Sequence, residues 1–300
     1  MPVRIYRVVG PLDLRRTLDP LARGPADRTV RFATGRMFRA GRTADGPASV
    51  ALAQTGDDVV AEAWGPGAER ALDEIPALLG LLEEPPLLVS GHPTIKMLAR
   101  RYPGVRILRS GAVLESLIPA ILEQKITGEE ARRAFAGLVR VHGEPAPGPP
   151  EWGLRLPPAP STLAGLPYYD YHPFGVERRR AELIRSVAAR ATWFEGSANL
   201  PLADAYARLT TVPGIGPWTA AEVAVRALGD ADAVSVGDFH LPNLVAFALA
   251  GEPRADDARM LELLEPYRGQ RARVIRLLEL SGIRAPRYGP RFSRRRIEEF

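Results

Sequence analysis

Hydrophobic and polar positions change their spacing along the chain. Near the N-terminus, short runs rich in valine and alanine are separated by turn residues, which is typical of strands. These runs cover residues 3–9, 29–33, 49–53 and 58–64. From residue 68 to 82, apolar residues recur at helical spacing and predict one helix that covers the sheet. The first 86 residues therefore predict a small α/β domain, and residues 83–86 resemble a linker.

From residue 93 onwards the apolar spacing becomes helical. An apolar helix is expected over residues 114–122, with Pro119 as either a kink or a late start. Thr127 and Glu130 have the spacing of a capping box and predict the start of the next helix. The proline-rich residues 144–160 predict an extended surface connection without a folded element.

Residues 209–243 predict two helices joined by a tight glycine-containing turn. Gly214 and Gly216 interrupt the helical spacing, and Pro217 suits the first position of a second helix that Gly229 ends. Glycines leave room for backbone N–H groups at a helix N-terminus to bind a phosphate. A side chain at Gly216 is expected to block that phosphate and to strain the turn. An ordinary pair of helices would use the same glycines, so the glycines alone leave both interpretations open.

Composition restricts the class of protein. The 300 residues are 46% hydrophobic and suffice for about two or three domains. The absence of cysteine excludes disulfides, zinc–thiolate sites and iron–sulfur clusters. No apolar run approaches the roughly 18 residues of a membrane span, and the first ten residues lack the long apolar region of a signal peptide, so a soluble cytoplasmic protein is expected. A net charge of +5 suits a polyanionic partner but also many ordinary proteins, and nearly all the positive side chains are arginines.

The segment PGIGPW, followed by an aspartate in VGDFHLPN, resembles the helix-hairpin-helix DNA glycosylases. Within them it is most similar to the alkylpurine enzymes of the 3-methyladenine DNA glycosylase II type. The resemblance spans most of the chain, because those enzymes also begin with an α/β domain. It implies an α+β, mostly helical fold, in which the small α/β domain precedes a two-lobed helical catalytic fold.

The same resemblance divides the chain. It implies an N-terminal domain over residues 1–86 and one helical lobe, made of residues 87–111 and 231–285, that carries the aspartate. The second lobe, residues 112–230, carries the hairpin. Residues 286–300 form a basic tail that would either touch DNA phosphates or remain a solvated terminus.

Asp238 is the candidate catalytic residue. Cleavage of an N-glycosidic bond builds positive charge on the deoxyribose, which a neighbouring carboxylate stabilises. Asp238 could equally cap a helix that begins near Leu241, but the upstream hairpin favours catalysis. Trp218 stands where the strand-cutting branch of the superfamily carries a lysine, and an indole cannot form a Schiff base. The resemblance therefore implies a monofunctional glycosylase that uses water.

The resemblance assigns Trp218, Glu222, Phe239 and Arg276 to a pocket for the flipped base. The indole of Trp218 would stack on a cationic purine, unless it is simply a core tryptophan. Glu222 and Arg276 depart from the pattern, because aromatic residues are expected at both positions. The range of damaged bases is thus the least determined part of the resemblance.

Gln124 and Lys125 match the loop that fills the gap left by a flipped base. Lys125 stands where the alkylpurine enzymes place an apolar wedge, and a solvated lysine between two helices is the alternative. Further expected contacts use only the backbone of the hairpin. Amides of Gly214, Gly216 and Thr219 would bind a DNA phosphate, and carbonyls of Thr210, Val212 and Ile215 would bind Na⁺ or K⁺.

These inferences predict a monomeric enzyme that acts on double-stranded DNA containing damaged bases. It would flip an alkylated purine such as 3-methyladenine and hydrolyse its glycosidic bond, with no required cofactor, in the cytoplasm at the nucleoid. The alternative is a non-catalytic helix-hairpin-helix protein that binds DNA without turnover.

Overall fold

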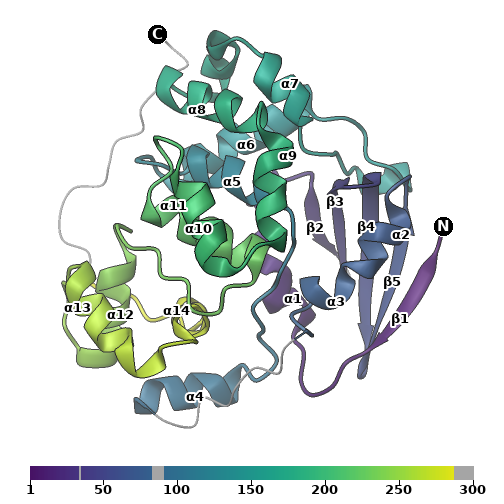
Figure 1. The fold of residues 1–300 in the computed structure, drawn as a ribbon. Coiled ribbons are helices and arrows are strands. Elements are labelled where there is room, and N and C mark those ends of the chain that lie inside the picture. Colours follow the sequence, from purple (N-terminus) through teal and green to yellow (C-terminus); the bar gives the residue numbers. More distant parts are fainter. Residues whose placement is uncertain (34, 83–90, 287–300) are drawn as a thin grey trace.

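The computed structural model describes residues 1–33, 35–82 and 91–286. The expected linker at 83–86 lies outside the described residues, and so does the expected basic tail apart from Pro286. Figure 1 shows a small sheet with short helices against it on one side of the molecule and a larger helical part on the other. The α+β, mostly helical fold is confirmed. None of the helices in the described ranges has the length and apolarity to cross a membrane.

The N-terminal sheet is antiparallel throughout, in the order β1-β5-β4-β3-β2. Its strands are β1 (Val3–Arg7), β2 (Val30–Ala33), β3 (Arg36–Thr43), β4 (Gly46–Thr55) and β5 (Asp58–Trp64). Strand β3 was not predicted, because arginines recur along it. Arg36, Arg39 and Arg42 form ion pairs with carboxylates of other segments at 2.7–2.9 Å, so tertiary partners make these charged positions compatible with a strand.

The expectation of one helix over residues 68–82 was wrong. The segment forms two short helices, α2 (Ala68–Asp73) and α3 (Ile75–Leu78), because Pro76 lacks an N–H and starts a new helix. Its apolar face was predicted correctly, since Leu72 and Leu79 are buried against the sheet. The short helix α1 (Leu14–Leu18), capped by Asp13, was not predicted and packs in the same core.

The rest of the described chain is helical. The α-helices are α4 (Pro93–Arg101), α5 (Val113–Leu122), α6 (Gly128–His142), α7 (Pro160–Gly165), α8 (Arg178–Ala188), α9 (Ala191–Glu195), α10 (Leu202–Thr210), α11 (Pro217–Val223), α12 (Leu241–Ala250), α13 (Asp257–Leu264) and α14 (Arg271–Leu280). Short 3₁₀ turns cover Asp19–Leu21, Pro150–Trp152, Tyr168–Phe174, Gly196–Asn199 and Glu265–Tyr267, and a π-helical turn, Ala224–Leu228, continues α11. Pro119 lies inside α5, and the capping box of Thr127 and Glu130 is confirmed at the start of α6.

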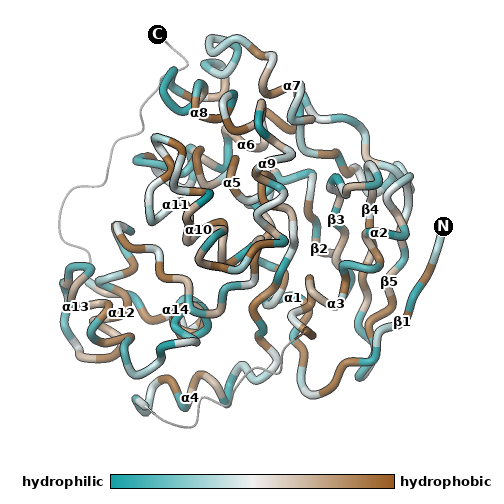
Figure 2. The backbone as a smooth tube through the Cα atoms, in the orientation of Figure 1, coloured by the Kyte–Doolittle hydropathy of each residue, from teal (hydrophilic) through white to brown (hydrophobic). Residues whose placement is uncertain are grey.

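Two separate cores hold these helices together. One is built mainly from α5, α6, α8, α10 and α11, and Figure 2 shows the hydrophobic stretch along α5. The other joins α4 to α12, α13 and α14, so residues distant in sequence pack together. The exact predicted domain boundaries stay predictions.

The connection between α6 and α7 is more ordered than its proline content suggested. Pro145 pairs with Arg155 in an isolated antiparallel bridge. The ring of Trp152 packs at 4.5 Å from Trp64 and 4.8 Å from Phe38, measured between ring centroids. The expectation that nothing folds here was wrong, because Trp152 of the connection packs against aromatic rings of the sheet.

Candidate active site

The predicted hairpin lies between the end of α10 at Thr210 and the start of α11 at Pro217. Gly214 has φ +101°, and an added Cβ would come within 2.9 Å of the Leu183 side chain. Gly216 has an extended backbone, φ −94° and ψ −177°, and an added Cβ would meet no atom within 4 Å. The turn therefore requires glycine at 214, and the expectation that a side chain at 216 would strain it was wrong.

The predicted gap-filling loop is fastened to this hairpin. The Gln124 side-chain amide donates to the Gly214 carbonyl and to the Thr219 hydroxyl, both at 2.9 Å. Lys125, next in the chain, is exposed and has φ +56°, the only positive φ among the described non-glycine residues. An L residue adopts this conformation at a cost of about 1–2 kcal/mol. Gln124 thus binds within the protein, and the role of Lys125 in the DNA gap stays a prediction.

The three carbonyls predicted to hold a monovalent cation lie at the C-terminal end of α10 and in the turn that follows. The Val212 carbonyl also accepts from the Ile215 N–H at 3.0 Å. Main-chain oxygens at the negative end of a helix dipole suit a hard cation, so the donor set fits Na⁺ or K⁺, and that site stays a prediction. Within the described ranges, no group of three or more His, Cys, Asp or Glu side chains could hold a metal ion.

Asp238 lies in the loop before α12 and is held by three N–H groups. Its Oδ1 accepts from the backbone N–H of His240 at 2.7 Å and of Leu241 at 2.8 Å. Its Oδ2 accepts from the indole N–H of Trp218 at 3.1 Å. Asp238 can therefore cap α12 and still serve as the predicted catalytic carboxylate, because these hydrogen bonds fix its orientation at the N-terminus of the helix.

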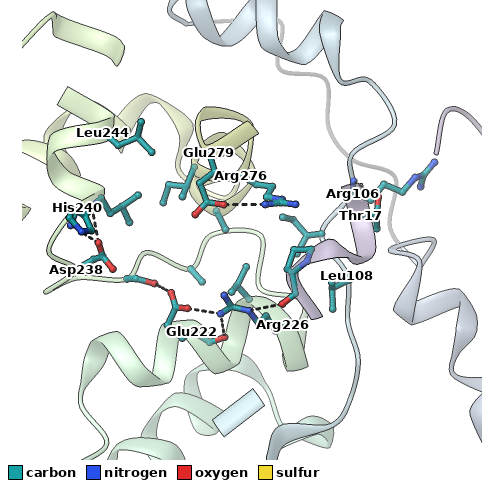
Figure 3. A pocket seen from close by; sticks show the side chains of 18 residues that line it. Thr17, Arg106, Leu108, Glu222, Arg226, Asp238, His240, Leu244, Arg276 and Glu279 are labelled. Carbon is teal, nitrogen blue, oxygen red and sulfur yellow. Dashed lines mark hydrogen bonds and ion pairs between the residues drawn. The ribbon is translucent and has the colours of Figure 1, made fainter. Parts of the chain in front are cut away.

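Asp238 lines a cavity of about 260 Å³, which is drawn in Figure 3. Its wall is formed by Thr17, Pro20, Arg106, Ile107, Leu108, Glu222, Val225, Arg226, Ala233, Ser235, Asp238, His240, Leu241, Leu244, Ala272, Ile275, Arg276 and Glu279. The wall thus combines the N-terminal segment, the end of the hairpin helix, the Asp238 loop and α14. The volume is slightly below the range of about 300–1,000 Å³ typical of drug-sized ligands, which suits a fragment such as one base.

Two of the four predicted pocket residues do not line this cavity. Glu222 and Arg276 do, whereas Trp218 and Phe239 do not. Trp218 instead orients Asp238, and Phe239 is 70% exposed with its ring against His240. The expectation of a stacking aromatic in the wall is therefore not met by this cavity.

Glu222 is held in a network that sequence analysis missed. Its carboxylate accepts from Arg226 at 2.6 Å and from the Ser235 hydroxyl at 2.5 Å (Figure 3). Burial alone would raise the pKa of Glu222, but Arg226, Ser235 and the more distant Arg23 together lower it. Arg226 lies four residues after Glu222, a spacing that could have indicated the pair.

Arg276 and Glu279 form the opposite part of the wall, on α14. The Arg276 guanidinium donates to the Arg16 carbonyl at 3.0 Å and lies 3.6 Å from Asp19 and 3.4 Å from Glu279. Partial desolvation in the cavity raises the pKa of Glu279, and Arg276 opposes that shift only in part. Glu279 was not predicted, although its spacing of three residues from Arg276 places both on one face of the helix.

The comparisons with known proteins confirm the predicted resemblance to the helix-hairpin-helix DNA glycosylases. The solved structure of a 3-methyladenine DNA glycosylase from Archaeoglobus fulgidus superposes with a TM-score of 0.79, at 22% identity over 92% of this chain and 97% of that one. This likeness establishes the fold. No family model matches the chain.

Two relatives extend the similarity to sequence. "Probable bifunctional transcriptional activator/DNA repair enzyme AlkA" of Mycobacterium tuberculosis is 29% identical over 168 residues, which are 55% of this chain and 34% of that protein. DNA-3-methyladenine glycosylase 2 of Escherichia coli is 27% identical over 187 residues, which are 61% of this chain and 63% of that protein. The match therefore spans about a third of the first relative and less than two thirds of the second.

Proposed function

We propose that this protein is a DNA glycosylase of base excision repair that removes an alkylated purine from double-stranded DNA and leaves the strand intact. The observation that carries the proposal is the position of Asp238. Its carboxylate is held by three N–H groups beside a cavity that suits one base. The similarity to proteins named as 3-methyladenine glycosylases supports the substrate class.

In the proposed reaction, the damaged nucleotide leaves the duplex, because its glycosidic bond is inaccessible inside the stack. The base enters the cavity and the sugar stays beside Asp238. The bond between C1′ and the base nitrogen breaks, and its electron pair leaves with the base, which a positive charge on an alkylated purine makes easier. The carboxylate stabilises the positive charge on the sugar until water adds to C1′ and loses a proton.

The proposed lack of strand cleavage is supported by Trp218. The residue at this position donates its indole N–H to Asp238, and no amine is available there for a Schiff base. The hairpin would bind the DNA backbone through the amides of Gly214, Gly216 and Thr219, and Lys125 would reach toward the gap. Because these contacts use one chain, we propose that the protein acts as a monomer.

The test is excision by the wild type and by Asp238→Asn on duplexes that carry 3-methyladenine, 7-methylguanine, 1,N6-ethenoadenine or hypoxanthine. Abasic products are then cleaved with alkali. We expect the wild type to release at least the alkylated purines and the variant to bind the same duplexes without releasing a base. Binding by the wild type without release from any duplex would instead support the non-catalytic DNA-binding protein.

A further inference from the structure

The two glutamates of the cavity differ in how strongly the protein itself engages them. The Glu222 side chain is 16% exposed and contacts Arg226 and Ser235 at 2.6 and 2.5 Å. The Glu279 side chain is 49% exposed, and its nearest described partner is Arg276 at 3.4 Å. Glu279 is therefore the carboxylate that remains available to a bound molecule.

The Glu279 side chain on α14 directs its carboxylate toward the cavity. Figure 3 shows the Glu279 carboxylate pointing into the open space, and a dashed line marks its contact with the Arg276 guanidinium at one edge. Arg276 is held on its far side by the Arg16 carbonyl at 3.0 Å and by Asp19 at 3.6 Å. Because it is shared among these groups, Arg276 does not form a close bidentate pair with Glu279.

Among the described residues, the imidazole of His240 is the one aromatic ring in the cavity wall. Among the described residues that line it, none is Phe, Tyr or Trp. The strong cation–π attraction of a Phe, Tyr or Trp ring is therefore missing from this wall, while a carboxylate can attract the same cation directly and accept its N–H groups.

We propose that Glu279 selects the damaged base, by pairing its carboxylate with the positively charged purine that enters the cavity. This inference rests on the proposed glycosylase function and adds to it a specificity residue and a preference for cationic over neutral lesions. Glu279 acts on the base, whereas Asp238 acts on the sugar.

Protonation of Glu279 should make this preference depend on pH. The charged groups around it are Arg276 on α14, Arg226 and Glu222 on the hairpin helix, Asp238 and His240 at the start of α12, and Asp19. Although about half of the Glu279 side chain is exposed, partial desolvation of its carboxylate in the cavity raises its pKa. Arg276 and Arg226 lower the pKa and Glu222 raises it, so that it lies above the ordinary value of a glutamate. A cationic base requires the deprotonated form, so its excision should increase as pH rises through that pKa.

The experiment compares wild type and Glu279→Gln on duplexes with 7-methylguanine, which is cationic, and hypoxanthine, which is neutral. We expect the ratio of the two single-turnover rates to fall about tenfold, because a neutral hydrogen bond replaces a charge-assisted one. The low-pH decrease in 7-methylguanine excision should also disappear. Glu279→Asp keeps the charge and should retain most of the preference, and Glu262→Gln, outside the cavity on α13, should leave it unchanged.

Several results would overturn the inference. An equal loss on both lesions would indicate a role in shape alone, and a larger loss on hypoxanthine would indicate proton donation to a neutral leaving base. If the wild type releases neither base, the proposed function fails separately. Calorimetry then measures how much more tightly wild type and Glu279→Gln bind 7-methylguanosine than guanosine. If the variant keeps the wild-type preference for 7-methylguanosine, the role of Glu279 is rejected. If the variant loses that preference, the role is supported.

Discussion

The two glycines of the hairpin should respond in opposite ways to substitution. Gly214 has φ +101°, and its Cβ would approach the flexible Leu183 side chain to 2.9 Å. Gly214→Ala should therefore lower the free energy of unfolding by at least about 1–2 kcal/mol. Gly216 has an extended backbone and open space around it, so Gly216→Asp should fold normally and its side chain can cap α11.

Gly216→Asp should instead weaken DNA binding. Its carboxylate would lie where we expect the phosphate, and two like charges about 4 Å apart repel by about 1 kcal/mol in water and about 4 kcal/mol at a protein surface. The dissociation constant should thus increase at least about fivefold, equally for damaged and undamaged duplexes, because backbone contacts carry no sequence information. Gly216→Ala is the matched control and should change it little.

Fluorescence anisotropy at fixed salt measures the binding, and urea unfolding measures stability. Unchanged affinity of Gly216→Asp for both duplexes would reject the phosphate clamp. Loss on the damaged duplex alone would assign the hairpin to lesion recognition. Wild-type stability of Gly214→Ala would show that the turn does not depend on glycine.

Three further predictions concern the site and the core. Asp238→Asn should reduce the single-turnover excision rate about 10²- to 10³-fold while DNA binding persists. The amide oxygen of the asparagine can still accept from His240 and Leu241, but it carries no charge. Excision by the variant at the wild-type rate would remove Asp238 from the mechanism. Borohydride should trap no protein–DNA adduct, and gel detection of one would identify an amine nucleophile. Burial raises the pKa of Glu195 to about 7, against the opposing effect of the Leu114 and Val113 N–H groups. The native state therefore keeps a proton that the unfolded chain releases above pH 4.5, and the free energy of unfolding should fall by up to about 3 kcal/mol between pH 4.5 and 7. Chemical denaturation of wild type and Glu195→Gln checks this, and a difference in unfolding free energy that does not change with pH would contradict it.

Local features of the fold could be predicted from the sequence because they depend on residues within a few positions of one another. The capping box of Thr127 and Glu130, the turn at Gly214 and the aspartate at the start of α12 are of this kind. Each rests on a hydrogen bond or a backbone angle that the local chain can form by itself.

The set of side chains around the cavity could not be predicted from the sequence, because it depends on packing between distant segments. Arg276 is fixed by Arg16 and Asp19 from the N-terminal domain, and Glu222 meets Ser235 only after the chain has turned back. Strand β3 depends in the same way on carboxylates elsewhere in the molecule. Helical spacing shows which residues share one face of a helix, but not which other segments pack against that face. The sequence therefore indicated the hairpin and Asp238, whereas the charged cavity and Glu279 required the tertiary structure.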